Sequence, residues 1–592
     1  MNHKVLYSIC VLLLWCLMPC VAIAETYTNP LGPFVADPWI MKYGEFYYVY
    51  GTACPGAATV KWIPVFKSRD MVNWSGPYKI FSSSEGCHWA PEGYHYDGYY
   101  YAMTTRFRRQ QKKPFLLVRS KSVLGPYTDY AAVDNKPGMA NDINIFVDTD
   151  GKSYLLYKHG QMHPLSSDWK TIGNLHKYKI EGMSEGPYMV KHNNRYNIFG
   201  ATTGSDKSGR NRGYYLVMGY SDSVFGPYTL WGSKESPVYY GDYRPGHGGY
   251  TSSPDGSEMW LTSHYDYRQA GFKWEHRKLA IDYWGGFDSD GWPHKVTQTK
   301  GVANNVPSRA IINGNIAASG KSVNASDYSG SNLPSYAING DSRTIWESGN
   351  GSLGKWLEVD LAGEFKIKEL TTMFNSEAAY KYAIQGSYDR YNWTMLVDNE
   401  SNTTSAQTFT DIVNESSYFR YIRISISEFP GAETCQIQEV QIINDNQDQF
   451  INYSDTLTLQ AENWSSSSRA LKIETCTDIN GGDNLTDTNI GEWIAFDNID
   501  IPSDGTYDIE FRVASDDHEN NWKFYDNGRL IATEHVGHTD GWQKWASLHT
   551  YDVSLTAGKH SFKLEFLDDG NNFNWIKIRK VNRANDITSP HY

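Results

Sequence analysis

Short hydrophobic runs separated by Gly, Asp, Asn and Pro make up the chain from Tyr27 to about Val306. Such runs occur, for example, at residues 46–50, 99–104, 153–157 and 258–262, and they are rich in Tyr, Val and Ile. Runs of this length and composition predict short β-strands, and amphipathic helical periodicity is scarce. This region is therefore predicted to be all-β.

An internal repeat organises these strands. The segment Ser-Lys-Ser-Val-Leu-Gly-Pro-Tyr-Thr at 120–128 recurs as Ser-Asp-Ser-Val-Phe-Gly-Pro-Tyr-Thr at 221–229. The first strands of successive units are marked at intervals of 52, 53, 43 and 62 residues, by Asp37, Trp89, Asp142, Glu185 and His247. Units of about fifty residues with four strands each predict a five-bladed β-propeller. Because inner strands point their ends at a central funnel, Asp37, Asp142 and Glu185 are expected to meet there.

The chain of 592 residues is too long for a single hydrophobic core. We expect the propeller over 25–306, followed by two further all-β units over 307–445 and 456–582. The polar segment 444–455 is predicted to be the linker between these last two units.

The N-terminus has the pattern of an export signal. Lys4 precedes the apolar run 5–21, which ends in Ala22-Ile23-Ala24, a small-x-small cleavage site. We expect a signal peptide over 1–24, cut after Ala24, with lipoprotein cleavage before Cys20 as the alternative. No later stretch approaches the roughly 20 apolar residues of a membrane span. The expected location is secreted or periplasmic.

Composition narrows the class of partner. A net charge of −13 argues against nucleic acid. The 43 Tyr and 20 Trp are typical of carbohydrate-active proteins, whose rings stack on sugars, although β-proteins in general are also aromatic-rich. Four cysteines follow the predicted signal: Cys54, Cys87, Cys435 and Cys476. Cys54 and Cys87 are expected either to pair or to remain buried free thiols.

Several motifs in the first region together resemble glycoside hydrolase family 43. The motifs are Ala36-Asp37-Pro38, Trp89-Ala90-Pro91-Glu92, the segment from Asp142 to Leu155, Glu185-Gly186-Pro187-Tyr188, Gly246-His247-Gly248 and the stretch from Arg277 to Pro293. The resemblance implies a five-bladed propeller with arabinanase, α-L-arabinofuranosidase or β-xylosidase activity. One departure is Asn141-Asp142-Ile143-Asn144, where many members carry Ile-Asp-Pro.

The same resemblance implies roles for the three carboxylates. Asp37 would be the general base that activates water, and Glu185 the general acid that protonates the leaving oxygen. Asp142 would orient Glu185 and raise its pKa. The expected outcome is inversion at the anomeric carbon, with no cofactor for catalysis.

Other residues of this region are expected to contact substrate. Trp89 is a candidate sugar platform, and Arg277 is a candidate substrate-binding residue. His247, between two glycines, is expected either to bind substrate or an ion at the propeller axis, or to be a hydrogen-bonded core imidazole.

The second unit resembles discoidin-like sandwiches, which include family 32 carbohydrate-binding modules. The motifs are Ala337-Ile338-Asn339-Gly340-Asp341, Trp356 to Leu361 and Ser387-x-Asp389-x-x-x-Trp393. The resemblance implies a structural Ca²⁺ held by Asp341 and Glu439.

The third unit resembles family 6 carbohydrate-binding modules, which are also β-sandwiches. The motifs include Leu459-Gln460-Ala461-Glu462, Gly541-Trp542-Gln543-Lys544-Trp545 and Asn572-Phe573-Asn574. Trp542 or Trp545 and Asn574 would contact sugar, and Glu462 would bind structural Ca²⁺. Asp487 stands where an aromatic ring is common, which puts binding at this cleft in question.

The leading hypothesis is an inverting exo-glycosidase that removes α-L-arabinofuranosyl residues from branched plant polysaccharides, with two carbohydrate-binding modules. The alternatives are a β-xylosidase, galactofuranosidase or endo-arabinanase on the same scaffold, and an inactive sugar-binding protein. A retaining fructan-processing propeller would normally carry Arg-Asp-Pro, which is absent. The glycan and linkage, the ligands of both modules and the oligomeric state stay open.

Overall fold

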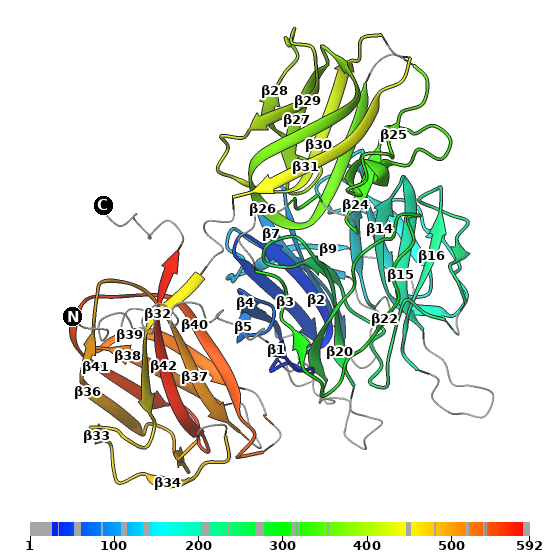
Figure 1. Ribbon diagram of the computed structural model, residues 1–592. Coiled ribbons are helices and arrows are strands. Elements are labelled where there is room, and N and C mark those ends of the chain that lie inside the picture. Colours follow the sequence, from blue (N-terminus) through cyan, green and yellow to red (C-terminus); the bar gives the residue numbers. More distant parts are fainter. Residues whose placement is uncertain are drawn as a thin grey trace, which may run out of the picture.

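The computed structural model shows an almost entirely β-structured chain with three bodies (Figure 1). The residues that the structure describes are 26–33, 35–52, 61–83, 87–107, 115–133, 141–202, 213–233, 236–266, 277–309, 315–317, 320–351, 354–431, 433–445, 451–478, 481–515, 520–536, 539 and 541–583. The described residues contain no α-helix, which confirms the all-β prediction. Within the described part of the chain, no helical segment is long and apolar enough to cross a membrane.

Five successive antiparallel sheets form the first body, apart from one parallel pairing of β18 with β22. The first sheet holds β2 (Ala36–Tyr43), β3 (Phe46–Thr52), β4 (Trp62–Ser68) and β5 (Ser75–Ser82). The second holds β6 (Cys87–Tyr96), β7 (Tyr99–Phe107), β8 (Phe115–Ser120) and β9 (Thr128–Val133). The third holds β10 (Asn144–Val147), β11 (Ser153–Tyr157), β12 (Gln161–Leu165) and β13 (His176–Lys177). The fourth holds β14 (Met183–His192), β15 (Arg195–Thr202), β16 (Leu216–Ser221), β17 (Thr229–Leu230), β18 (Tyr239–Tyr240) and β22 (Val296–Thr297), and the fifth holds β19 (Tyr250–Ser252), β20 (Met259–Tyr265) and β21 (Lys278–Tyr283).

These sheets close into a ring through their hydrophobic cores. Each sheet shares a buried cluster with the next, and the fifth shares one with the first, where Ile40 and Val49 pack with Trp260 and Ile281. Near the closure, β1 (Thr26–Tyr27) pairs with β23 (Asn304–Asn305). The propeller architecture is thus confirmed. The count of five blades stays a prediction, because the fifth sheet has three strands among the described residues.

The second body is a sandwich built around one very long strand. Its elements are β24 (Ser322–Ala325), the 3₁₀ helix η3 (Pro334–Ile338), β25 (Trp346–Glu347), β26 (Lys355–Ala378), β27 (Lys381–Ser387), β28 (Thr394–Asp398), β29 (Ala406–Ile412), β30 (Tyr418–Glu428) and β31 (Gln436–Asn444). The first half of β26 pairs with β24 and β30, and its second half pairs with β29 and β31. One strand thereby joins both layers around a shared core.

The third body is a sandwich of two separate sheets. One sheet holds β34 (Lys472–Thr475), β35 (Asp483–Thr486), β42 (Asn572–Arg583), β37 (Gly505–Ala514), β40 (Ala546–Leu555) and β32 (Ile451–Gln460). The other holds β33 (Ser466–Ser467), β36 (Trp493–Ile501), β41 (Gly558–Phe566), β38 (Asn520–Asp526) and β39 (Arg529–Val536). The predicted linker 444–455 is partly wrong, because β31 ends at Asn444 and β32 already pairs with β42 from Ile451.

The middle sandwich covers one end of the propeller's inner strands. In β2 the Lys42 ammonium lies 4.1 Å from the centre of the Phe365 ring. At the end of β10, Arg390 donates to the Val147 carbonyl oxygen at 2.8 Å. Next to the end of β14, Asn324 donates to the Lys191 carbonyl oxygen at 2.8 Å. The same three strands carry Asp37, Asp142 and Glu185 at or just before their starts, so the sandwich lies at the opposite end from these acids.

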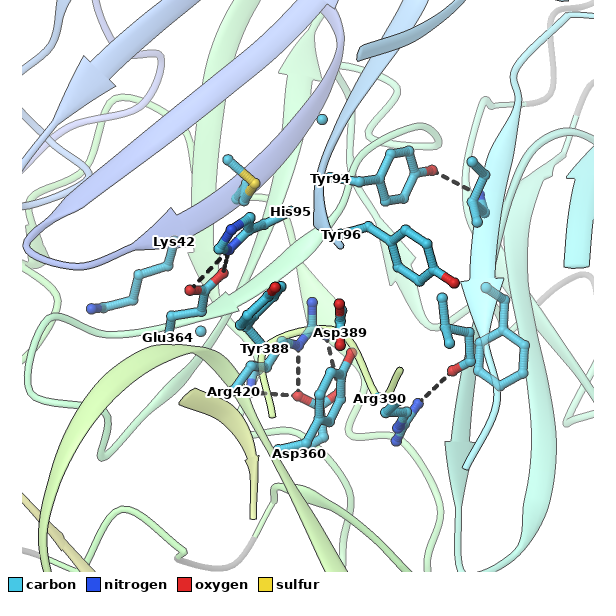
Figure 2. A pocket seen from close by; sticks show the side chains of 18 of the residues that line it. Lys42, Tyr94, His95, Tyr96, Asp360, Glu364, Tyr388, Asp389, Arg390 and Arg420 are labelled. Carbon is cyan, nitrogen blue, oxygen red and sulfur yellow. Dashed lines mark hydrogen bonds and ion pairs between the residues drawn. The ribbon is translucent and has the colours of Figure 1, made fainter. Parts of the chain in front are cut away.

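Charged pairs fill this junction, as Figure 2 shows. His95 of β6 bonds to Glu364 at 2.9 Å, and Arg420 bonds to Asp360 at 2.8 Å. The lining residues surround a cavity of about 100 Å³ between the two bodies. Because the buried carboxylates of Asp360 and Glu358 are paired with Arg420 and Arg390, these charges are compensated inside the junction.

Candidate functional site

The three predicted carboxylates come together through their backbones and one histidine. The Gly186 N–H, directly after Glu185, donates to Asp142 Oδ2 at 3.3 Å. On the other side, His247 Nδ1 lies 3.6 Å from Asp37 Oδ1. His247 also covers Gly186, where an added Cβ would come within 2.8 Å of the imidazole. These contacts form one continuous group from Asp37 through His247 and Gly186 to Asp142.

Irregular backbone places these residues. Asp37 and Asp142 have φ angles of 53° and 58°, which residues other than glycine rarely adopt. The ladder between β2 and β3 shifts register between Ala36 and Trp39, and the ladder between β14 and β15 shifts on both sides of Glu185. Bulges of this kind re-aim a side chain at the edge of a sheet. The acids therefore stand where regular pairing breaks down.

Asp37 is held in its ionised form. Arg277 donates to Asp37 Oδ1 at 2.8 Å, and the Thr52 hydroxyl donates to Oδ2 at 3.1 Å. Burial opposes ionisation, but Arg277, His247, His264 and the Thr52 hydrogen bond outweigh it and lower the pKa of Asp37 to about 2. The Asp37 N–H also donates to His264 Nδ1 at 3.1 Å, which fixes the backbone of the acid.

The surroundings of Asp142 and Glu185 favour their protonated forms, in contrast to Asp37. Burial, with the charge of Asp37, raises the pKa of Asp142 to about 7. Burial, with Asp142 and Asp37, also raises the pKa of Glu185, which is partly exposed. The group therefore has one ionised member, Asp37, and two acids, Asp142 and Glu185, whose protonated forms are favoured.

Comparison with known proteins identifies this region. Residues 27–293 match the family model described as glycosyl hydrolases family 43. They form a family 43 glycosyl hydrolase domain. Residues 320–440 match an F5/8 type C domain, and residues 460–580 match a family 6 carbohydrate-binding module, in the order expected from the motifs.

Individual relatives are distant. A non-reducing end α-L-arabinofuranosidase of Bacteroides ovatus is 27% identical over 47% of this chain and 55% of its own length. A xylosidase/arabinosidase of Humicola insolens is 25% identical over 38% of this chain and 47% of its own length. The clotting factor G α subunit of Tachypleus tridentatus is 34% identical over 22% of this chain and 19% of its own length. The chain thus spans about half the length of these two glycosidases.

Among solved structures, an arabinoxylan arabinofuranohydrolase of Bacillus subtilis aligns with a TM-score of 0.39 and 15% identity. The alignment covers 94% of this chain and 96% of that one.

The other predicted residues of the family 43 domain differ in their placement. Arg277 and His247 lie beside Asp37, as described above. Trp89, on β6, is partly exposed. The loop 204–212, whose conformation would set the depth of a substrate pocket, lies outside the described residues.

A fourth acid, Glu92, belongs to the same electrostatic group and has no role in the prediction. It is buried on β6, and its pKa is raised to about 8 by burial, with a contribution from Asp142. Its place in the motif Trp-Ala-Pro-Glu was visible in the sequence, but its burial was not. Tyr214 was also missed; its hydrogen bond to Glu185 lowers the pKa of that acid and opposes the burial.

The residues of the family 6 module that are predicted to contact sugar differ in their exposure to solvent. Asn574 is fully buried and donates to Asp478 Oδ2 at 3.0 Å, which removes its amide from the surface. Trp542 and Trp545 are partly exposed, and the Trp542 ring packs on Gly570. Asp487 pairs with Lys472.

The residues expected to hold Ca²⁺ fit a cation to different degrees. Glu462 Oε2 is buried without a hydrogen-bond partner among the described residues, as an oxygen awaiting a cation would be. Burial raises the pKa of Glu439 to about 7, whereas Asp341 is bound by Arg343 at 2.7 Å. Within the described ranges, no three His, Cys, Asp or Glu side chains are grouped to hold a metal.

The cysteines divide into two classes. Cys87 is disulfide-bonded, and Cys54 lies outside the described residues. Cys435 and Cys476 are free, buried thiols.

Proposed function

We propose that the family 43 domain is an inverting exo-glycosidase with Asp37 as general base and Glu185 as general acid. The observation that carries this proposal is that the pKa values of the two acids are shifted in opposite directions. The pKa of Asp37 is lowered to about 2, while that of Glu185 is raised. An acid–base pair needs one carboxyl ionised and the other protonated at the same pH.

The reaction would proceed in one displacement. Asp37 accepts a proton from a water molecule that attacks the anomeric carbon, and Glu185 protonates the departing oxygen. Inversion requires the two carboxyls to lie roughly 6.5 to 9.5 Å apart so that this water fits between them. Asp142, which accepts the Gly186 N–H, would position the backbone of Glu185 and keep its pKa high.

The proposed substrate is a non-reducing terminal α-L-arabinofuranosyl residue of a branched plant polysaccharide. The name of the B. ovatus relative supports this substrate. The two rear domains would bind the polysaccharide and raise the local concentration of chain ends around the catalytic domain.

The test is release of 4-nitrophenol from 4-nitrophenyl α-L-arabinofuranoside by the full chain. Asp37→Asn and Glu185→Gln should each lower kcat by about 10³-fold or more. Proton NMR of the first-formed sugar should show the inverted anomer. Wild-type protein that releases nothing from this substrate would contradict the proposed substrate, and a retained anomer would contradict the proposed mechanism.

β-Xylosidase activity is the second candidate, because the H. insolens relative is named a xylosidase/arabinosidase. The same assay with 4-nitrophenyl β-D-xylopyranoside distinguishes the two candidate activities. A kcat/KM for the xyloside above that for the arabinofuranoside would replace the first substrate and leave the roles of the acids unchanged.

We also propose export of the chain with cleavage after Ala24, and structural Ca²⁺ in both rear sandwiches. Glu462 would hold the ion in the last domain, and Glu439 with Asp341 in the middle domain. Mass determination of the secreted protein tests the cleavage. Removal of Ca²⁺ with a chelator should lower the Tm of the wild type, because a ligand that binds only the folded state stabilises it. Glu462→Gln should reduce that difference.

A further inference from the structure

Glu92 is an unusual buried acid, because the described residues supply it with no cation. Its carboxyl oxygen Oε2 accepts hydrogen bonds from the Tyr94 hydroxyl and, at 2.9 Å, from the Asn144 amide. Burial, which is the largest cause, and the neighbouring Asp142 raise its pKa to about 8. Glu92 is therefore a neutral carboxylic acid at and below neutral pH.

Asp148 shows what an ordinary buried acid looks like in the same domain. It receives hydrogen bonds from the Lys191 ammonium and the Tyr196 hydroxyl, each at 2.7 Å. These partners, led by Lys191, outweigh the effect of burial and lower the pKa of Asp148. The contrast shows that a paired cation, which the described residues do not supply to Glu92, decides whether a buried acid of this domain is ionised.

The hydrogen bonds of Glu92 connect three inner strands of the propeller. Glu92 and Tyr94 lie on β6, while Asn144 is the first residue of β10. The Tyr94 hydroxyl accepts the Ile145 N–H at 2.7 Å, and Asn144 Oδ1 accepts the Met189 N–H of β14 at 3.4 Å. Asn144 stands two residues after Asp142, and Met189 stands four residues after Glu185.

We propose that Glu92 is a positioning residue, which holds Asn144 and thereby the strand starts that carry Asp142 and Glu185. This inference rests on the proposed function, since it assigns Glu92 to the support of the same acids. A charged group in this position would repel Asp142, whereas a neutral acid accepts the amide without doing so.

Two substitutions separate shape from charge. Glu92→Gln keeps the size, the neutral state and an acceptor for Asn144, so kcat should stay within about threefold of wild type. Glu92→Ala removes the acceptor, and kcat should fall by about 100-fold with KM little changed, as misplaced catalytic groups produce. Equal, severe losses in both variants would overturn the proposal, because Glu92 would then act as a charge. Wild-type kcat in the Ala variant would overturn it too.

The pH profile provides a readout that a purely structural role would not move. Above the pKa of Glu92 the wild type carries a further negative charge beside Asp142, which the Gln variant lacks. Their profiles of kcat against pH should coincide below this pKa and separate above it. Profiles that coincide throughout contradict the proposal. Asp148→Asn is the matched control, expected to lower Tm without changing the shape of the profile.

Hydrogen exchange tests the positioning without any substrate, so failure of the proposed function would not hide failure of this inference. Amides of residues 142–147 and 183–190 should exchange faster in Glu92→Ala than in wild type, and at the wild-type rate in Glu92→Gln. Unchanged exchange in the Ala variant would refute the role of Glu92.

Discussion

Carboxyl groups of the same chemical type are set to different protonation states by their neighbours. Asp37 has Arg277 at 2.8 Å and stays ionised. Asp142 and Glu92 are buried without such an ion pair among the described residues, and their pKa values rise to about 7 and about 8. Because an ion pair stabilises the charged form and burial disfavours it, the placement of Arg277 decides which of these acids is ionised.

The first prediction concerns the pH dependence of activity. Glu185 must be protonated, so kcat/KM should fall as pH rises through the raised pKa values of the coupled Glu185 and Asp142 pair. Asp37 is ionised above about pH 2, so no loss on the acid side should come from the base over the range in which the protein stays folded.

Arg277→Met should bring an acid limb into view, because Asp37 then loses its strongest stabilising charge and its pKa rises. The measurement is kcat/KM against pH for both proteins. A variant profile that shows no acid limb beyond that of the wild type would indicate that Asp37 does not act as the base.

At the scale of elements, the positions of the acids depend on breaks in strand pairing rather than on regular strands. Gly186 has a φ of 58°, and the imidazole of His247 occupies the space that a side chain would need. The register shifts on both sides of Glu185 lie where Glu185, Asp142 and His247 come together.

The second prediction is that Gly186→Ala lowers kcat by about tenfold or more, because the new Cβ must displace His247 from its place beside Asp37. Gly330→Ala is the matched control: Gly330 has the same φ of 58° but nothing within 4 Å of an added Cβ. Both variants bear the backbone strain of about 1 kcal/mol, and only the first has the clash. Equal kcat in the two variants would refute the steric argument.

At the scale of the whole molecule, both sandwiches are bound to the propeller by buried charge. The middle domain buries Glu358 between Arg390 and Arg423, which in turn donate to the Val147 and Thr149 carbonyl oxygens. The last domain is held by Arg69, which lies 2.6 Å from Asp508 and 2.5 Å from Asp552. The three bodies therefore form one unit in which the rear domains have a set orientation to the catalytic domain.

The third prediction follows from the burial of Asp508, whose side chain has 0% exposure. Arg69→Ala leaves this carboxylate buried without its cation, which should lower the free energy of unfolding by on the order of 3 kcal/mol. Calorimetry should show an earlier, separate transition for the last domain. Lys559→Ala, which breaks an exposed pair with Asp500, is the control and should cause no measurable change. A single unshifted transition in the Arg69 variant would contradict the set orientation.

Much of this architecture follows from local sequence. Alternating Tyr- and Val-rich runs determine the strands, and the recurring Gly-Pro-Tyr turns mark successive units of the propeller. Asp37, Asp142 and Glu185 stand at unit starts, so their convergence could be predicted once the units were recognised. The linker was predicted less well, since pairing of Ile451 with Arg583 joins residues far apart in the chain.

The sequence by itself thus determined the strand content, the order of the three domains and the three acids that come together. Only the tertiary structure decided the protonation states of Asp37 and Glu92, the loss of Asn574 from the surface, and the face of the propeller that the middle domain covers. The physical reason is that strand formation depends on neighbours a few residues away. A pKa or a domain contact depends on charges and burial contributed by residues that are remote in sequence.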